Sequence, residues 1–241
     1  MQYIGSKSAY VFVNSEPLID FATPTIAKVI YIGGIGAQEP KKLDENWERL
    51  LEKRSRTVLI SFGSMVKSVY LPEDVRMALI ETFKSFPETT FIWKYEEDDD
   101  FAMNIGDKVG YTTMFRSQER ARVHYSRRNG LHARNGMRGG IFVPIFAEQP
   151  RNAGMMEFNG LGKIITKVEM TNASKIIEVV REVLENPSYY ENAQRTAAML
   201  RKKPFTSREQ LVSYTEFAAE FGPSAALRPQ SHDMSWIEYN N

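Results

Sequence analysis

Continuous apolar runs alternate along this sequence with segments in which apolar residues recur at helical spacing. TVLISFGS at 57–64 and IFVPIF at 141–146 are unbroken apolar runs that lead into turn or loop residues, as expected for strands covered on both faces. After the first run, Val75, Leu79 and Phe83 fall on one face of a helix. This alternation predicts an α/β fold, a Rossmann-like parallel sheet flanked by helices.

The same reasoning places the other expected elements. Strands are predicted at 10–14, 28–33, 57–64, 89–96, 141–146 and 163–166, and helices around 45–51, within 70–87 and 172–187, and at 189–201 and 207–221. The acidic run EEDDD at 96–100 is interpreted as the solvated exit of a strand, and Trp93 as a core residue rather than a stacking platform. In a doubly wound sheet, ligands bind beyond the carboxyl ends of the strands, so a site is expected in the loops that follow them.

Composition excludes several classes of site. The 241 residues include no cysteine, which rules out disulfides and thiolate metal sites. The 31 lysines and arginines are balanced by 30 acidic residues, which argues against a polyanion-binding protein as a whole. The chain shows no long apolar run and no signal peptide, so the printed sequence by itself indicates a soluble domain.

The loop SFGSMV at 61–66 follows one predicted strand and precedes a helix. Gly63 lets the backbone come close to a ligand, and backbone amides together with the Ser64 hydroxyl can hold a phosphate. The alternative is a turn that merely connects the strand to the helix.

The loop AEQPRN at 147–152 follows another predicted strand. Glu148 can accept hydrogen bonds from two neighbouring hydroxyls, and Gln149 supplies both a donor and an acceptor, as vicinal sugar hydroxyls require. The alternative is a polar loop with Glu148 in solvent and Asn152 capping the next helix.

Residues 122–140, RVHYSRRNGLHARNGMRGG, do not fit the pattern of the chain. They contain five arginines, no lysine and no apolar period. As a genuine basic loop, this stretch would bind nucleic acid or anionic lipid by neutralising phosphates. Few aromatics are interleaved with the arginines and no nucleic-acid-binding fold accompanies them, so no nucleic-acid partner is expected.

Several stretches together resemble the UDP-glycosyltransferase family, and most closely the UDP-glucuronosyltransferase type of nematodes. They are VFVNSEPLIDFATPTIAKVIYIGGIG, VLISFGSM, FIWKYE, IFVPIFAEQPRNAGMMEFNGLG, ENPSYYENAQRTAAMLRKKP and SHDMSW, and they cover most of the chain outside 97–140. The resemblance implies the C-terminal half of a GT-B glycosyltransferase. Residues 1–40 would be a linker and strands leading from the N-terminal domain, and 41–241 the donor-binding domain, with 114–140 aberrant.

The resemblance also implies roles for individual residues. Ser64 matches the serine that contacts the donor diphosphate, and Glu148 and Gln149 match the acidic–glutamine pair that holds the sugar hydroxyls. Gln118 would stand in for a family glutamine in the segment that follows. No catalytic residue is assigned, because the base histidine of the family belongs to the N-terminal domain and none of the three histidines here matches it.

The implied reaction transfers a glucuronosyl or hexosyl group from a UDP-sugar, UDP-glucuronic acid or UDP-glucose, to the hydroxyl of a small lipophilic acceptor. No metal and no other cofactor is implied. The family sits at the endoplasmic reticulum membrane through a signal peptide and a C-terminal helix that this sequence does not show, so the printed chain is expected to be soluble or mislocalised. A non-catalytic fragment that binds UDP weakly, or that associates with a full-length relative in a homo- or hetero-oligomer, is the alternative.

The genetic code offers an explanation for the arginine-rich stretch. From Val123 to Met137, the last two bases of each codon and the first base of the next permit the reading FITHGGMGSTHETA. This reading carries the His-Gly-Gly diphosphate signature of the family, in register and directly ahead of IFVPIF. We therefore expect a frame slip, in the gene model or in the gene, with the printed chain inactive as a consequence.

Overall fold

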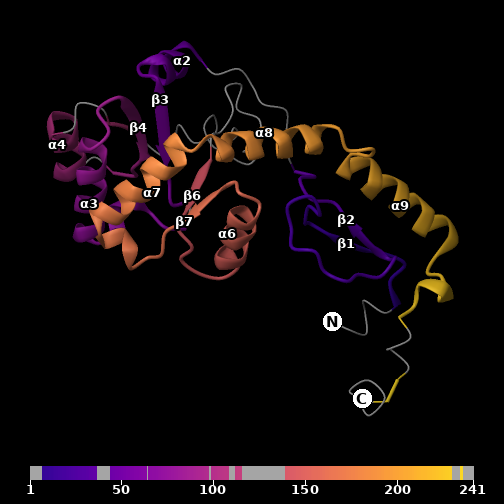
Figure 1. Ribbon diagram of the computed structural model, residues 1–241. Helices are drawn as coiled ribbons and strands as arrows, with labels where there is room; N and C mark the ends of the chain where they lie inside the picture. The colour runs from indigo at the N-terminus through magenta and orange to yellow at the C-terminus, as the bar shows by residue number, and fades with distance from the viewer. Residues whose placement is uncertain are drawn as a thin grey trace. The chain divides into compact units, whose positions relative to one another are not determined.

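The computed structural model describes residues 7–36, 44–63, 65–97, 99–108, 112–115, 139–229 and 234–235 (Figure 1). The chain divides into two compact units: unit 1 comprises Met1–Ala37 and Ala198–Asn241, and unit 2 comprises Gln38–Ala197. Ser64 and Gln118 lie outside the described residues, as does the segment 116–138.

Unit 2 alternates strands and helices as the sequence predicts. Its elements are α2 (Glu45–Glu52), β3 (Arg56–Ile60), η1 (Ser68–Tyr70), α3 (Glu73–Lys84), β4 (Thr89–Lys94), α4 (Asp100–Lys108), β5 (Thr112–Phe115), β6 (Gly140–Phe142), α6 (Gln149–Phe158), β7 (Gly162–Ile164), η3 (Glu169–Thr171), α7 (Ala173–Glu185) and most of α8 (Pro187–Arg201). All paired strands are parallel. The predicted α/β class with a parallel sheet flanked by helices is therefore confirmed.

The strands of unit 2 form two parallel sheets among the described residues. Strands β3, β4 and β5 form one sheet in the order β3-β4-β5, and β6 pairs with β7 in the other. With β3 as strand 1, the order of the first sheet matches the 3-2-1 half of the classic Rossmann order.

The core of unit 2 lies between the sheet β3-β4-β5 and the helices α3 and α7, which pack against each other. Trp93 is fully buried, which confirms its predicted place in the core. The Phe83 ring stacks on Phe91 with centroids 4.5 Å apart, and Trp93 meets Phe83 edge-on at 5.8 Å. Such aromatic contacts stabilise the fold beyond the effect of the apolar area that they bury, and they hold α3 against β4.

Helix α4 and strand β5 are among the elements of unit 2 that were not predicted, and one interpretation was wrong. Helix α4 and strand β5 follow the acidic run that was taken as a solvated exit. In that run, Glu96 is buried in an ion pair. Asp99 accepts a hydrogen bond from the Ala102 amide at 2.8 Å, in the first turn of α4, and another from the Tyr95 hydroxyl at 2.9 Å. The acidic run therefore contributes both a buried charge and a helix-capping side chain.

Unit 1 pairs two short parallel strands, β1 (Val11–Val13) and β2 (Val29–Tyr31), and contains α9 (Ser207–Phe221) and η4 (Ala225–Leu227). The Ser207 hydroxyl donates to the Gly33 carbonyl at 2.6 Å, and Lys203 pairs with Glu16 at 2.7 Å. Thr206 and Glu209 form a reciprocal capping box at the start of α9. These contacts join the two ends of the chain within one unit.

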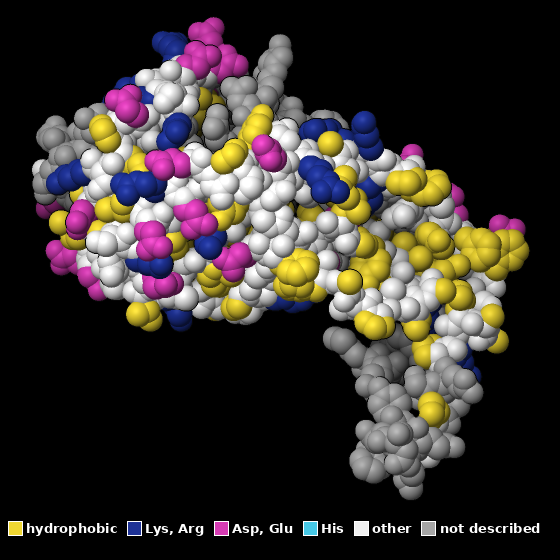
Figure 2. Space-filling model, viewed as in Figure 1, with side chains coloured by type: hydrophobic (Ala, Val, Ile, Leu, Met, Phe, Trp, Pro, Cys, Tyr) yellow, Lys and Arg dark blue, Asp and Glu magenta, His cyan; other side chains and the backbone are white. Residues whose placement is uncertain are grey.

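The surface carries charges of both signs. On the face seen in Figure 2, acidic and basic side chains are mixed over unit 2, whereas hydrophobic side chains gather over α9. In the described part of the chain, no helix combines the length and the apolar character needed to cross a bilayer.

Candidate functional site

The loop after β3 turns at Gly63, whose φ of 92° lies in the left-handed region that favours glycine. Its amide donates to the Ser61 hydroxyl at 3.3 Å, and its carbonyl accepts a hydrogen bond from the Lys94 ammonium. The loop therefore has a defined backbone at the carboxyl end of β3, where the fold predicts a ligand.

A buried ion pair lies against this loop. Lys94 Nζ is 2.9 Å from Glu96 Oε1, with the two side chains 3% and 5% exposed. Glu96 Oε2 accepts from the Ser68 amide at 2.6 Å, and the Ser68 hydroxyl donates to the Lys94 carbonyl at 2.6 Å. The Trp93 indole N–H donates to the same Ser68 hydroxyl at 3.1 Å. This network, Lys94–Glu96–Ser68, joins the end of β4 to both ends of the segment 63–68.

The loop after β6 turns at Ala147, whose φ of 53° is left-handed although the residue is not a glycine. The Ile145 amide donates to Gln149 Oε1 at 2.8 Å, and the Gln149 amide donates to the Phe146 carbonyl at 3.2 Å. The side chain of Gln149 thus fixes the loop that precedes its own helix, α6.

Glu148 lies at the position before α6, with its side chain exposed and without a capping hydrogen bond. Its carbonyl accepts from the Asn152 amide at 3.0 Å, so Asn152 lies inside the first turn of α6 and does not cap it. The expectation that Asn152 caps the next helix is wrong, because the helix begins three residues earlier. The exposed carboxylate beside a helix N-terminus remains free to meet a ligand hydroxyl.

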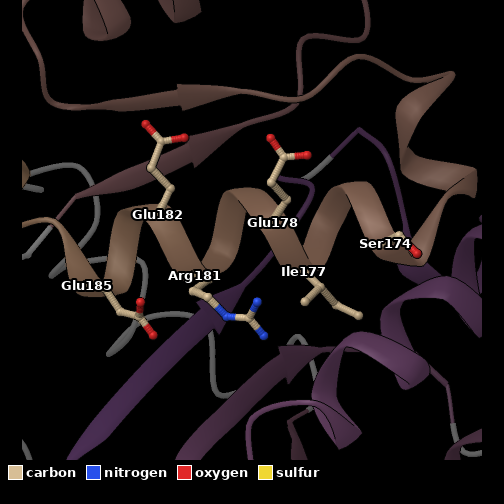
Figure 3. A pocket seen from close by; sticks show the side chains of 6 residues that line it. All are labelled: Ser174, Ile177, Glu178, Arg181, Glu182 and Glu185. Atoms are coloured by element: carbon tan, nitrogen blue, oxygen red, sulfur yellow. The ribbon is translucent and has the colours of Figure 1, made fainter.

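One surface hollow is unrelated to these loops. Figure 3 shows that its six lining side chains all come from α7: Ser174, Ile177, Glu178, Arg181, Glu182 and Glu185. Glu178 pairs with Lys175 at 3.0 Å, and Glu182 with Lys163 at 3.6 Å. The hollow is an open strip of one helix, and two of its three carboxylates already have partners, so it offers no enclosed binding site.

Of the four residues predicted to bind the donor, the structure describes Glu148 and Gln149, and it places them side by side at one strand end. Sequence reasoning did not find the support of the other loop, Lys94 and Glu96. The sequence did carry a signal for this pair. Residues i and i+2 of a strand share a face, and Lys94 and Glu96 have this spacing at the end of the fully buried strand β4.

Comparisons with known proteins show the family of the chain. The family model described as "UDP-glucoronosyl and UDP-glucosyl transferase" matches residues 2–113 and 120–241. UDP-glucuronosyltransferase ugt-48 of Caenorhabditis elegans is 27% identical over 255 residues, which cover 100% of this chain and 48% of that protein. Mouse UDP-glucuronosyltransferase 1A7 is 28% identical over 244 residues, which cover 95% of this chain and 44% of that protein. The chain thus spans about half the length of the curated relatives it matches.

A solved structure supports the predicted fold. The chain superposes on the glycotransferase of kitacinnamycin with a TM-score of 0.55 and 15% sequence identity, covering 80% of this chain and 49% of that one. The expectation of a GT-B half is confirmed at the level of the fold.

Proposed function

The chain belongs to the UDP-glucoronosyl and UDP-glucosyl transferase family, and from this premise we propose that unit 2 holds a UDP-sugar donor at the loops that follow β3 and β6. The observation that carries the proposal is the placement of the Gly63 turn and of the pair Glu148–Gln149 at the carboxyl ends of parallel strands. Ligands of doubly wound sheets bind there.

The two loops would divide the donor between them. The Gly63 turn would bring the backbone close to the diphosphate, and the exposed Glu148 carboxylate would accept from sugar hydroxyls. The side-chain oxygen of Gln149 already accepts a hydrogen bond from the Ile145 amide, so the side-chain NH₂ group is the part left to donate to the sugar. Ser64 and Gln118 complete the proposed donor contacts on the strength of family resemblance alone.

In the proposed reaction of the whole protein, the hydroxyl oxygen of a small lipophilic acceptor bonds to the anomeric carbon as the bond from that carbon to the diphosphate breaks. The electron pair stays on UDP, the acceptor proton passes to a base, and the sugar configuration inverts. The contribution of this unit would be electrostatic, because donors already oriented toward the diphosphate stabilise the charge that it gains as it leaves. The endoplasmic reticulum membrane location of such an enzyme stays a prediction from the resemblance.

Titration of the chain with UDP in a calorimeter tests the donor-binding proposal. We expect heat of binding at millimolar UDP, reduced in a variant with Glu148→Ala when UDP-glucuronic acid replaces UDP. Absence of heat at millimolar UDP would remove the binding role.

We further propose that the printed chain does not catalyse the transfer, because the stretch 123–137 stands where the alternative frame would carry the diphosphate signature. A turnover assay with UDP-glucuronic acid and a phenolic acceptor should give no product above a heat-killed control. Sequencing the transcript across Gly110–Pro144 would reveal the frame.

A second role, association with a longer relative, draws support from unit 1. Two parallel strands of three residues each are too small to form a stable sheet alone. Large apolar side chains on α9 are exposed as well: Val212, Tyr214, Phe217 and Phe221. Sedimentation of the chain with and without a purified full-length relative tests this role, and a mixture that sediments as two independent species would refute it.

A further inference from the structure

Lys94 and Glu96 form a deeply buried ion pair at the end of β4. Their side chains are 3% and 5% exposed, whereas those of the pair Lys203–Glu16 are 20% and 15% exposed. Burying two charges costs more free energy than an apolar pair of similar volume would, so stability alone gives no reason to keep them.

The pair makes one contact at each end of the segment 63–68. Lys94 Nζ donates to the Gly63 carbonyl, and Glu96 Oε2 accepts from the Ser68 amide at 2.6 Å. A hydrogen bond to a carbonyl fixes the plane of its peptide bond, and each such plane carries an N–H group opposite its carbonyl. Lys94 therefore sets the orientation of the backbone at the point where the loop turns.

We propose that Lys94 and Glu96 are positioning residues for the donor site, which hold the Gly63 turn in the orientation that receives the diphosphate. This inference rests on the proposed function. Lys94 does not contact the ligand itself, because its ammonium is buried and is already bonded to the Gly63 carbonyl and to Glu96. Preorganised backbone dipoles bind a developing charge without the cost of reorganising them, so a loosened turn lowers donor affinity even when the fold is intact.

The experiment must separate positioning from stability. Lys94→Met leaves the Glu96 carboxylate buried without a cation, and this variant is expected to be poorly folded. The double variant Lys94→Met/Glu96→Gln removes both charges and keeps an acceptor for the Ser68 amide. Replacing a buried pair by neutral groups is often close to neutral for stability, so the double variant should fold. Lys203→Met, which breaks a partly buried pair in unit 1, is the matched control.

Two readouts are compared in the full chain: an NMR readout, which comprises the carbonyl ¹³C shift of Gly63 and the exchange rate of the Ser64 amide in the same peptide plane, and the initial slope of a UDP titration. In the double variant we expect an altered Gly63 carbonyl shift, amide exchange about tenfold faster and UDP affinity about tenfold weaker, while the melting temperature stays near that of the parent chain. Lys203→Met should change stability without changing either loop readout.

A double variant with the parent Gly63 carbonyl shift and the parent UDP affinity would overturn the proposal. A parent chain that binds no UDP would instead refute the proposed function. In that case the carbonyl shift and amide exchange would still decide whether the pair orients the turn, because neither measurement needs a ligand.

Discussion

The two candidate loops follow equivalent points of the fold and are held in different ways. The loop at Gly63 uses the residue best suited to its left-handed backbone and is fixed by a buried ion pair from the neighbouring strand. The loop at Ala147 places a less suited residue in a left-handed backbone and is fixed by the side chain of Gln149 from its own helix. The first loop thus depends on tertiary packing, and the second on local contacts.

Glu96 supports the first loop, and Glu148 lies in the second. Of the changes proposed here, Glu96→Ala should lower the free energy of unfolding most and Glu148→Ala least. This change leaves the Lys94 ammonium buried without its counter-ion and the Ser68 amide without its acceptor. We expect a loss of about 3–5 kcal/mol in the free energy of unfolding, measured by urea denaturation. A loss below about 1 kcal/mol would mean that the pair is solvated in solution and that the first loop is held by other contacts.

The contribution of Tyr189, which donates a hydrogen bond to Glu182, to the stability of unit 2 should decrease at alkaline pH. Burial, together with the hydrogen bond to Glu182, raises the pKa of Tyr189 from 10.0 to about 12. A raised tyrosine pKa stabilises the folded chain fully below pH 10, and this contribution falls as the pH rises from 10 to about 12, by roughly 2–3 kcal/mol.

The comparison with Tyr189→Phe isolates this effect from other groups that titrate in alkali. The difference in the free energy of unfolding between the parent chain and the variant should be constant below pH 10 and should shrink as the pH rises toward 12. A stability difference that stays constant between pH 10 and 12 would show that Tyr189 has the same pKa in the folded and unfolded states.

Exchanging the turn residues should have unequal effects on stability. At Gly63 an added Cβ meets no atom within 4 Å, so Gly63→Ala costs the strain of the left-handed backbone alone, about 1–2 kcal/mol. At Ala147 the same strain is already present, and Ala147→Gly relieves it while adding chain entropy to the unfolded state, for a net change near zero. Thermal unfolding of both variants tests the contrast, which fails if the two changes are equally destabilising.

The smallest effect on stability is expected for Glu148→Ala. The side chain is exposed and makes no capping hydrogen bond, so the free energy of unfolding should change by less than about 0.5 kcal/mol. The affinity for UDP-glucuronic acid should fall while that for UDP stays the same, because the proposed contact is to the sugar. A change of stability as large as that of Glu96→Ala would remove the distinction between the loops.

The parts of the fold that the sequence predicted are those set by local periodicity. The strands near Leu59, Ile92 and Ile141 and the helices α3, α7 and α9 carry clear apolar patterns. Helix α4 was missed because Gly106 and the acidic run disguise it, and it is held by tertiary packing of Phe101 against Trp93 and Tyr95. The left-handed Ala147 was missed too, since a single sequence gives no sign of it.

The candidate site divides in the same way. Glu148 and Gln149 were found because their residue types suit sugar hydroxyls at a predicted strand end. Lys94 and Glu96 were missed because their role depends on a loop about thirty residues earlier in the chain, which periodicity does not report. Long-range contacts of this kind become visible only once the strands are paired.

The most direct test of the account compares the printed chain with a repaired one, in which residues 123–137 are replaced by FITHGGMGSTHETA. Calorimetry would measure the UDP affinity of both. If unit 2 is a donor-binding domain that lacks its diphosphate signature, the repaired chain should bind UDP about tenfold to a hundredfold more tightly, because it would regain hydrogen bonds to the phosphates. Equal affinity in the two chains, or no binding by the repaired one, would contradict the account.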